Sequence, residues 1–542
     1  MFVKTKQTNK SNILVQGSIL AAASIMVRII GLIYRIPMTR ILGDTAMGYY
    51  GSAYEFYSIA LLLSSYSLPL AVSKLVSTRV EMGMHRNAKR VFVMALAFGI
   101  VVGSIATCVC FFGAPYYADY IGQQGVIAPL RVLAPTIFVF SVMGVIRGYF
   151  QGHGNMVPTA ISQVIEQIVN AVVSVGAAYW MYNRYSSASY GAAGGTLGTF
   201  AGAVAALLSL VTMYMIYRRA FAKIASLESE ESRDTERPAH ILWLIVVTVV
   251  PVVVSQTVYQ VSGTLDDIFF NRIMGDRGMI DTTRAAMMGI YTNKYRLLTN
   301  VPVAVASALG TAIVPGLIAD YLRGRLDTVK DKVASAVKFN MIIAFPSAIG
   351  MSALAGPILM LLLGDSNPLS RNVLMFGSIS ILFFALSTLT NGILQGINHL
   401  HIPVIHSAIS LVIHLGTLYV LLTYTDLGIY ALVICNVLFA AVVCVLNWIA
   451  IGRYLSYRQE ILKTFAIPLI ASIVMGACAR CCYLVLDQMV GNGIACIASI
   501  GVAVMVYFAL LILLQGVTKE ELLAMPKGRF LVRILTKIRL LR

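Results

Sequence analysis

Charged residues are scarce in this sequence. Aspartate, glutamate, lysine and arginine together make up 12% of the 542 residues, whereas 58% are hydrophobic and the mean hydropathy is +0.81. A soluble protein of this length could not bury so much apolar surface. The composition therefore excludes a soluble enzyme and predicts an all-α polytopic membrane protein.

Acidic residues are the scarcer of the two charged kinds, 23 against 41 basic ones, which gives a net charge of +18. The basic residues fall in alternate loops between apolar stretches, as the positive-inside rule describes, so the charge does not indicate nucleic-acid binding. The same rule places both termini in the cytoplasm. We therefore expect a multi-pass protein of a bacterial cytoplasmic membrane.

Motifs of catalysis and metal binding are missing. The sequence has no phosphate-binding loop, no nucleophile with a nearby base and no cluster of cysteine with histidine. The eight cysteines lie in apolar stretches, which favours neither a disulfide framework nor a zinc site. We expect a protein that is not an enzyme and carries no cofactor or metal, and that draws on the membrane potential or a monovalent cation.

Apolar stretches of about 20 residues are abundant and predict fourteen transmembrane helices. They are expected at 13–37, 47–72, 91–113, 129–150, 158–182, 193–217, 241–271, 285–318, 335–363, 371–395, 403–424, 428–452, 463–486 and 492–516.

The first twelve of these helices form an internal repeat. MGYYGSAYE at 47–55 matches MGIYTNKYR at 288–296, and RGYFQG at 147–152 matches NGILQG at 391–396. Six helices per repeat is an even number, so the two lobes share one orientation and a pseudo-twofold axis runs along the membrane normal. The expected domains are an N-lobe, a mobile cytoplasmic linker, a C-lobe, and two extra helices with a basic cytoplasmic tail, at 1–217, 218–240, 241–452 and 453–542.

The first apolar stretch carries arginines at membrane depth. Arg28 lies near its middle and Arg35 follows seven residues later, about two helical turns, so both point to one side. A guanidinium in hydrocarbon is costly unless it faces water or a partner. Arg40, near the end of the stretch, suits an anchor at the interface. We interpret Arg28 and Arg35 as the cationic lining of a central cavity that accepts an anion.

Other charged residues inside the predicted spans extend this set. Glu55 and Arg296 occupy equivalent repeat positions with opposite charge, and Lys294 lies beside Arg296. Glu166 belongs to a polar stripe that either lines the cavity or joins helices as polar glue. Arg147 lies near a cytoplasmic end and is interpreted as a positive-inside anchor. The expected substrate-binding residues are thus Arg28, Arg35, Glu55, Glu166, Lys294 and Arg296.

Two adjacent carboxylates, Asp266 and Asp267, stand in the seventh span. Two negative charges at this depth require that one be protonated, or that sodium, Lys294 or Arg296 lie nearby. Both aspartates are candidates for ion coupling. The alternative is an ion pair that only orders the helix bundle.

Several stretches resemble one known group of transporters. VRIIGLIYRIPMTRILGD, RGYFQG with PTAISQVIEQ, ALGTAIVP and FPSAIGMSALAGPI are similar in content and order to the multidrug/oligosaccharidyl-lipid/polysaccharide exporter superfamily. Within it, the sequence resembles the branch of MurJ-type lipid II flippases and stage V sporulation protein B. The likeness covers about the first 450 residues.

This resemblance implies two lobes around a cationic cavity, alternating access, and a groove at the last two helices for a polyprenyl tail. By position, Arg28 matches the family's essential first-helix arginine, and Arg296 matches its eighth-helix arginine. Arg35 neighbours the place of a second family arginine of the first helix, now Tyr34. An arginine of the family's second helix has no counterpart here. Asp266 falls where some members ligate sodium.

The expected function is flipping of the lipid-linked peptidoglycan precursor lipid II from the inner to the outer leaflet, with the arginines binding its pyrophosphate. The expected partners are an undecaprenyl-type sugar pyrophosphate, membrane lipids and cell-wall synthesis enzymes. Three alternatives stay open: a flippase for another polyprenyl-linked polysaccharide or a sporulation-specific paralogue, a cation-coupled multidrug antiporter that uses Asp266, Asp267 or Glu166, and a non-transporting scaffold.

Overall fold

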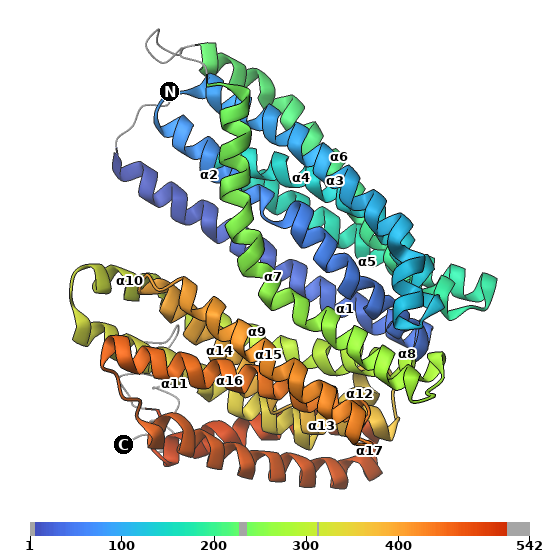
Figure 1. Cartoon of the computed structure of the whole chain (residues 1–542). Helices are drawn as coiled ribbons and strands as arrows, with labels where there is room; N and C mark the ends of the chain where they lie inside the picture. The colour runs from blue at the N-terminus through green and yellow to red at the C-terminus, as the bar shows by residue number, and fades with distance from the viewer. Residues whose placement is uncertain (1–5, 227–235, 312–313, 518–542) are drawn as a thin grey trace. The chain divides into compact units, whose positions relative to one another are not determined.

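The computed structural model describes residues 6–226, 236–311 and 314–517, and Figure 1 shows the chain as a set of long helices. Within these ranges every regular element is helical and no strand is present. The middle of the expected linker, 227–235, and most of the expected tail, 518–542, lie outside the described residues.

Contacts divide the chain into two units, Met1–Gly289 and Ile290–Arg542. The first unit holds α1 (Lys6–Leu61), η1 (Leu62–Tyr66), α2 (Leu68–Glu81), α3 (His85–Ile121), η2 (Gln124–Val126), α4 (Ile127–Gly152), α5 (Val157–Tyr185), α6 (Ala188–Ser226), α7 (Pro238–Asp276) and nearly all of α8 (Asp281–Ile290). Contacts group α7 with the helices before it, because α7 contacts α1, α2 and α3. The expected lobes at 1–217 and 241–452 stay predictions.

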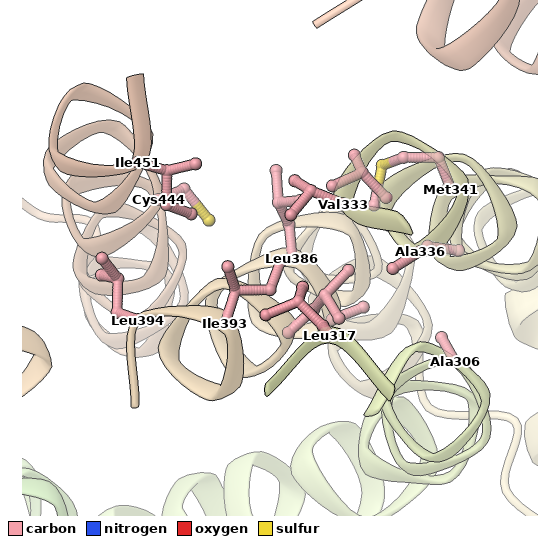
Figure 2. Packing of buried hydrophobic residues seen from close by; sticks show 14 of the residues in the cluster. Ala306, Leu317, Val333, Ala336, Met341, Leu386, Ile393, Leu394, Cys444 and Ile451 are labelled. Atoms are coloured by element: carbon pink, nitrogen blue, oxygen red, sulfur yellow. The ribbon is translucent and has the colours of Figure 1, made fainter. Parts of the chain in front are cut away.

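The second unit continues with η4 (Tyr291–Arg296), α9 (Leu297–Thr311), α10 (Val314–Leu322), α11 (Leu326–Ala353), α12 (Ala355–Leu363), α13 (Pro368–Gly377), α14 (Ser380–Gly396), α15 (His401–Tyr424), α16 (Ile429–Leu455), η5 (Leu462–Ala466) and α17 (Ile467–Leu513). Figure 2 shows its main core, where side chains from five of these helices interdigitate. Those labelled are Ala306, Leu317, Val333, Ala336, Met341, Leu386, Ile393, Leu394, Cys444 and Ile451.

Glycine and proline set several helix ends. Pro368 occupies the first turn of α13, where its missing N–H costs nothing, and the side chain of Asn367 caps that turn by accepting from Leu369 N at 2.9 Å. Gly122 and Gly364 end α3 and α12 in the left-handed conformation, with φ of 67° and 66°. Gly122 and Gly364 are 242 positions apart, close to the 241 that separate the repeat motifs at 47–55 and 288–296, so the same terminator serves both units.

Two long helices each contain a break at a glycine. Gly43 interrupts α1 with φ 69° and ψ −179°, and Gly491 interrupts α17 with φ 77° and ψ 163°. At 56 residues α1 would extend about 84 Å, far more than a bilayer core of about 30 Å. Both breaks fall in the short gaps between predicted spans, at 38–46 and 487–491.

Among the described residues, nine helical segments are long and apolar enough to cross a membrane, or ten if the bent pair α13 and α14 is one span. The segments containing Gly43 and Gly491 are 64 and 52 residues long and are each counted once. The chain is therefore a multi-pass membrane protein. The total of fourteen spans and the pseudo-twofold axis stay predictions.

The C-terminal end of the expected linker is held in place. Glu236 accepts a hydrogen bond from Arg79 Nε at 2.8 Å and forms an ion pair with the same guanidinium at 2.5 Å. Its backbone N–H donates to Asn87 Oδ1 at 3.2 Å, and its carbonyl accepts from Arg90 Nη1 at 3.0 Å. Glu236 therefore connects the approach to α7 with α2 and α3, and the mobility of the linker stays a prediction.

A crossing of α1 and α8 depends on two glycines. A Cβ at Gly48 would lie 1.8 Å from the carbonyl oxygen of Ala285, and a Cβ at Gly289 would lie 2.1 Å from that of Asp44. Gly48 and Gly289 are as far apart in the sequence as Asp44 and Ala285, so each pair occupies equivalent positions of the repeat. Each glycine therefore makes the same kind of contact with the opposite helix. Only glycine allows the two backbones to approach this closely.

Candidate functional site

Arg28 and Arg35 lie on α1, before its break at Gly43. Arg28 is exposed, and neighbouring residues of the same helix, Ile25 and Ile29, are exposed at 59% and 53%. An arginine in this position would face hydrocarbon at a cost of several kcal/mol or more unless water reaches it. The role of Arg28 in lining a cavity stays a prediction.

Arg35 is half-buried and lies among tyrosines. Its guanidinium lies close to the side chains of Tyr34, Tyr50 and Tyr54. The rings of Tyr50 and Tyr54 stand 4.6 Å apart, and the Tyr54 hydroxyl is hydrogen-bonded to Thr199 on α6. These contacts fix the Arg35 side chain within the first unit. The sequence analysis missed this cluster, although the tyrosine-rich stretch 49–57 was its visible signal.

Glu55 lies against α7. Its backbone carbonyl accepts from Thr264 Oγ1 at 2.8 Å. Its carboxylate occupies the space beside Gly263, where a Cβ would lie 2.4 Å from Oε2. Glu55 therefore depends on a glycine of α7 for its position, and the first unit holds it half-buried.

Asp267 is completely buried and joins three helices. It accepts hydrogen bonds from Ser52 Oγ at 2.6 Å, Tyr117 Oη at 2.9 Å and Asn271 Nδ2 at 3.0 Å. Gln123 extends this network by donating to Asn271 Oδ1 at 2.7 Å. Three donors thus satisfy the oxygen atoms of this buried carboxyl group.

Asp266, the neighbour of Asp267, is also buried, at 2% exposure. The contacts of Asp267 suit a residue that orders α1, α3 and α7, which is one of the two readings of this pair. Its role in ion coupling, like that of Asp266, stays a prediction.

Glu166 forms an ion pair with Arg147. Arg147 Nη2 lies 2.8 Å from Glu166 Oε2, and Arg147 Nε donates to Ser162 Oγ at 3.0 Å. The two charged side chains are 11% and 21% exposed. The guanidinium of Arg147 thus links α4 to α5, and its position at the interface stays a prediction. For Glu166, this pair favours the polar-glue alternative.

Lys294 and Arg296 belong to the second unit, in the π-helical turn η4. Lys294 is 3% exposed and donates to Asp365 Oδ2 at 2.6 Å and to Ser370 Oγ at 3.2 Å. Arg296 is half-buried, and its guanidinium carbon lies 5.9 Å from the centre of the Tyr291 ring. Asp365 and Ser370 were not among the predicted residues, because they lie over 70 positions away in a loop and a different helix.

Asp365, in the loop before α13, is held in its ionised form. Burial alone would raise its pKa, but hydrogen bonds from Lys294, from Ser370 and from the backbone N–H of Asn367 outweigh burial and hold the pKa below its ordinary value of 3.8. The Asn367 N–H lies 2.8 Å from Asp365 Oδ1. A permanently charged partner for Lys294 follows from this arrangement.

The predicted residues thus form two groups. The first unit contains Arg28, Arg35, Glu55, Glu166, Asp266 and Asp267, and the second contains Lys294 and Arg296. In the part of the chain that the structure describes, no three His, Cys, Asp or Glu side chains are close enough to hold a metal ion. The chemistry available is therefore that of guanidinium and carboxylate groups on apolar helices.

Comparisons with known families agree with a transporter. A family model described as polysaccharide biosynthesis protein matches residues 13–319, and a second model, MatE, matches residues 251–420.

Two curated proteins of Bacillus subtilis (strain 168) are similar over most of their length. Lipid II flippase MurJ is 25% identical over 493 residues, which covers 87% of this chain and 88% of that protein. Stage V sporulation protein B is 24% identical over 518 residues, which covers 95% of this chain and 98% of that protein.

A solved structure of lipid II flippase MurJ in an inward closed conformation has a similar fold. The TM-score is 0.65 at 13% sequence identity, and the match covers 91% of this chain and 97% of that one. At this identity the likeness establishes the fold alone. The helices therefore have the arrangement of a known transporter fold.

Proposed function

Because this chain belongs to the polysaccharide biosynthesis protein family, and to the branch of the multidrug/oligosaccharidyl-lipid/polysaccharide exporter superfamily that contains MurJ and stage V sporulation protein B, we propose that it flips lipid II. In this proposal the substrate passes from the inner to the outer leaflet of a bacterial cytoplasmic membrane by alternating access. In its broader form, the proposal is that the chain is a flippase of lipid-linked polysaccharide precursors.

The observation that carries the proposal is the extent of the similarity. Two relatives named for lipid II flipping and for sporulation align with 87% and 95% of this chain. Such coverage includes both units and α17, so the likeness is not limited to one shared bundle of helices.

The arginines supply the chemistry that the substrate requires. A lipid-linked sugar pyrophosphate has a large anionic head, which cannot cross hydrocarbon unaided, and an undecaprenyl-type tail that stays in lipid. Guanidinium groups bind pyrophosphate oxygens through bidentate, charge-assisted hydrogen bonds. We assign this role to Arg28, Arg35 and Arg296, of which Arg28 is exposed on an apolar helix.

Growth rescue tests the proposal. In a bacterium depleted of its own lipid II flippase, the unaltered chain is expected to restore growth, whereas Arg28→Ala and Arg296→Ala are expected to abolish rescue although the proteins reach the membrane. Arg40→Ala is the matched control, since Arg40 lies on the same helix near its interfacial end. Full rescue by both Arg28→Ala and Arg296→Ala would contradict the proposal.

Reconstituted vesicles separate the possible headgroups. Translocation of lipid II is compared with that of another polyprenyl-linked sugar pyrophosphate, and rescue of vegetative growth is compared with rescue of the spore cortex. Transport of the second lipid alone would favour the alternative flippase, and rescue of the cortex alone would favour the sporulation-specific paralogue.

The second candidate function is cation-coupled drug export, which the MatE match over residues 251–420 and the buried Asp267 favour. Expression would then raise resistance to cationic drugs, and Asp267→Asn would remove that resistance. Unchanged resistance on expression would eliminate this candidate.

A further inference from the structure

Lys294 lies in the short π-helical turn η4, where the chain makes a wider turn than an α-helix. The turn spans Tyr291–Arg296 and joins α8 to α9. π-helical turns are rare and concentrate at functional sites, because the wider turn changes the direction of the side chains around it. Contacts with neighbouring helices must stabilise this wider turn.

Two residues of η4 are held by other helices of the second unit. The ammonium group of Lys294 contacts Asp365 Oδ2 at 2.6 Å and Ser370 Oγ at 3.2 Å. Tyr295 donates its hydroxyl proton to Asn436 Oδ1 on α16 at 3.0 Å, and its ring fills the space beside Gly377, where a Cβ would lie 2.3 Å from it. The turn is thus attached to the start and end of α13 and to α16.

The geometry of the turn explains where Arg296 points. In an α-helix, residues five apart are rotated by about 140° around the axis, so their side chains diverge. A π-helical turn closes its hydrogen bonds between residues five apart and has more residues per turn, so side chains five apart lie closer to one face than they do in an α-helix. Arg296 follows Tyr291 by five positions, and its guanidinium carbon lies 5.9 Å from the centre of the Tyr291 ring.

We propose that Lys294 is a positioning residue for Arg296: its ion pair with Asp365 holds η4 in the π form, and the π form places the Arg296 guanidinium over Tyr291. Lys294 is 3% exposed and its ammonium group contacts an ionised carboxylate, so it supports the site instead of contacting the headgroup. The inference rests on the proposed function only in that Arg296 binds the substrate.

Thiol labelling tests the direction of side chain 296 without any assay of transport. In the full chain with its eight native cysteines replaced, Arg296→Cys is labelled in membranes with a small cationic methanethiosulfonate. Asp365→Asn is then added. We expect the labelling rate to change at least about tenfold, because thiol reactivity follows exposure and local charge.

Two controls distinguish a specific change in the direction of side chain 296 from a general loss of packing in the second unit. Asn300→Cys is exposed on α9 beyond the turn and reports on the rest of the helix. Asp426→Asn removes an exposed carboxylate from another loop of the same unit. We expect the rate at position 300 with Asp365→Asn, and the rate at position 296 with Asp426→Asn, to stay within about twofold.

Exchange of the two charges provides the rescue. Lys294→Asp combined with Asp365→Lys restores an ion pair, so the labelling rate at position 296 is expected to return toward that of the parent. An unchanged rate at position 296 with Asp365→Asn, or an equal change at positions 296 and 300, would overturn the proposal. Failure of the chain to flip lipid II would leave these labelling results intact, so the two failures are distinguishable.

Transport gives an independent readout. If Lys294 acts through Arg296, Asp365→Asn combined with the conservative Arg296→Lys transports no worse than Arg296→Lys alone, because residues acting as a unit are not additive. A further loss in the combined variant would show that Asp365 and Lys294 act by another route.

Discussion

At the scale of single residues, the charged side chains inside the helices are held in pairs and networks. Glu166 meets Arg147, Lys294 meets Asp365, and Asp267 meets three neutral donors. Hydropathy locates such residues because each interrupts an apolar stretch, yet the partner of Lys294 lies 71 positions away. A role in binding or in structure therefore depends on contacts that spacing along one helix does not describe.

Removal of one partner of the Arg147–Glu166 pair is expected to destabilise the first unit. Arg147→Met leaves a largely buried carboxylate without its cation, which costs on the order of 3 kcal/mol. Adding Glu166→Gln removes that charge and is expected to recover part of the loss. The unfolding midpoint of the purified protein in detergent measures both effects.

The exposed pair Lys330–Asp327 is the matched control. Its side chains are 33% and 99% exposed, so Lys330→Met is expected to cost less than about 1 kcal/mol. Equal losses for the two pairs would show that burial does not govern the strength of the Arg147–Glu166 pair.

The lowered pKa of Asp365 predicts a pH dependence. Since the pKa in the folded chain lies below the ordinary 3.8, ionised Asp365 stabilises the fold above that value, and the stabilisation is lost as the pH falls through the lowered pKa. The difference in unfolding midpoint between the parent and Asp365→Asn is expected to stay constant from about pH 8 to about pH 5 and to narrow below about pH 4. A difference that varies between pH 6 and pH 8 would point to another titrating group.

At the scale of whole elements, glycines decide where helices break and where they cross. Gly43 and Gly491 interrupt helices too long for one span, and their positive φ is accessible to glycine at little cost. Gly48 and Gly289 have a different role, since they allow α1 and α8 to approach closely. The sequence identifies the first kind from gaps between apolar stretches, whereas the second kind lies inside predicted spans.

Gly48→Ala is expected to weaken the crossing of α1 and α8. Its Cβ would lie 1.8 Å from a backbone oxygen of Ala285, so the helices must move apart at a cost of about 1–3 kcal/mol. Gly113→Ala is the matched control, because Gly113 lies inside α3 with nothing within 4 Å of its added Cβ. That variant is expected to be neutral or stabilised by up to about 1 kcal/mol through helix propensity. Thermal unfolding of the two variants decides between steric conflict and propensity.

At the scale of the whole molecule, a cationic site that carries an anion outward couples transport to voltage. A potential negative inside pushes the bound anion outward and favours the return of the empty cationic site, at about 2.3 kcal/mol per elementary charge per 100 mV. No nucleotide is needed for such a drive, in keeping with the absence of a phosphate-binding loop.

Headgroup translocation in vesicles is therefore expected to rise severalfold when a potassium gradient with valinomycin sets the inside-negative potential, and to fall when the gradient is removed. The same measurement in sodium and in choline media tests coupling through Asp266 and Asp267. A translocation rate that does not depend on voltage but requires sodium would indicate that ion binding at the carboxylates drives transport.

The sequence by itself determined the membrane character, the positions of the breaks at Gly43 and Gly491, the polar positions inside the helices and the superfamily. These properties follow from local composition and short motifs, because about 20 apolar residues suffice to define a span. Only the tertiary structure decided that α7 and α8 pack with the first unit, that Arg147 pairs with Glu166 and that Lys294 pairs with Asp365. Those outcomes depend on which distant segments of the chain contact each other. Hydropathy indicates whether a residue lies within the membrane, but it does not indicate which residue it contacts there.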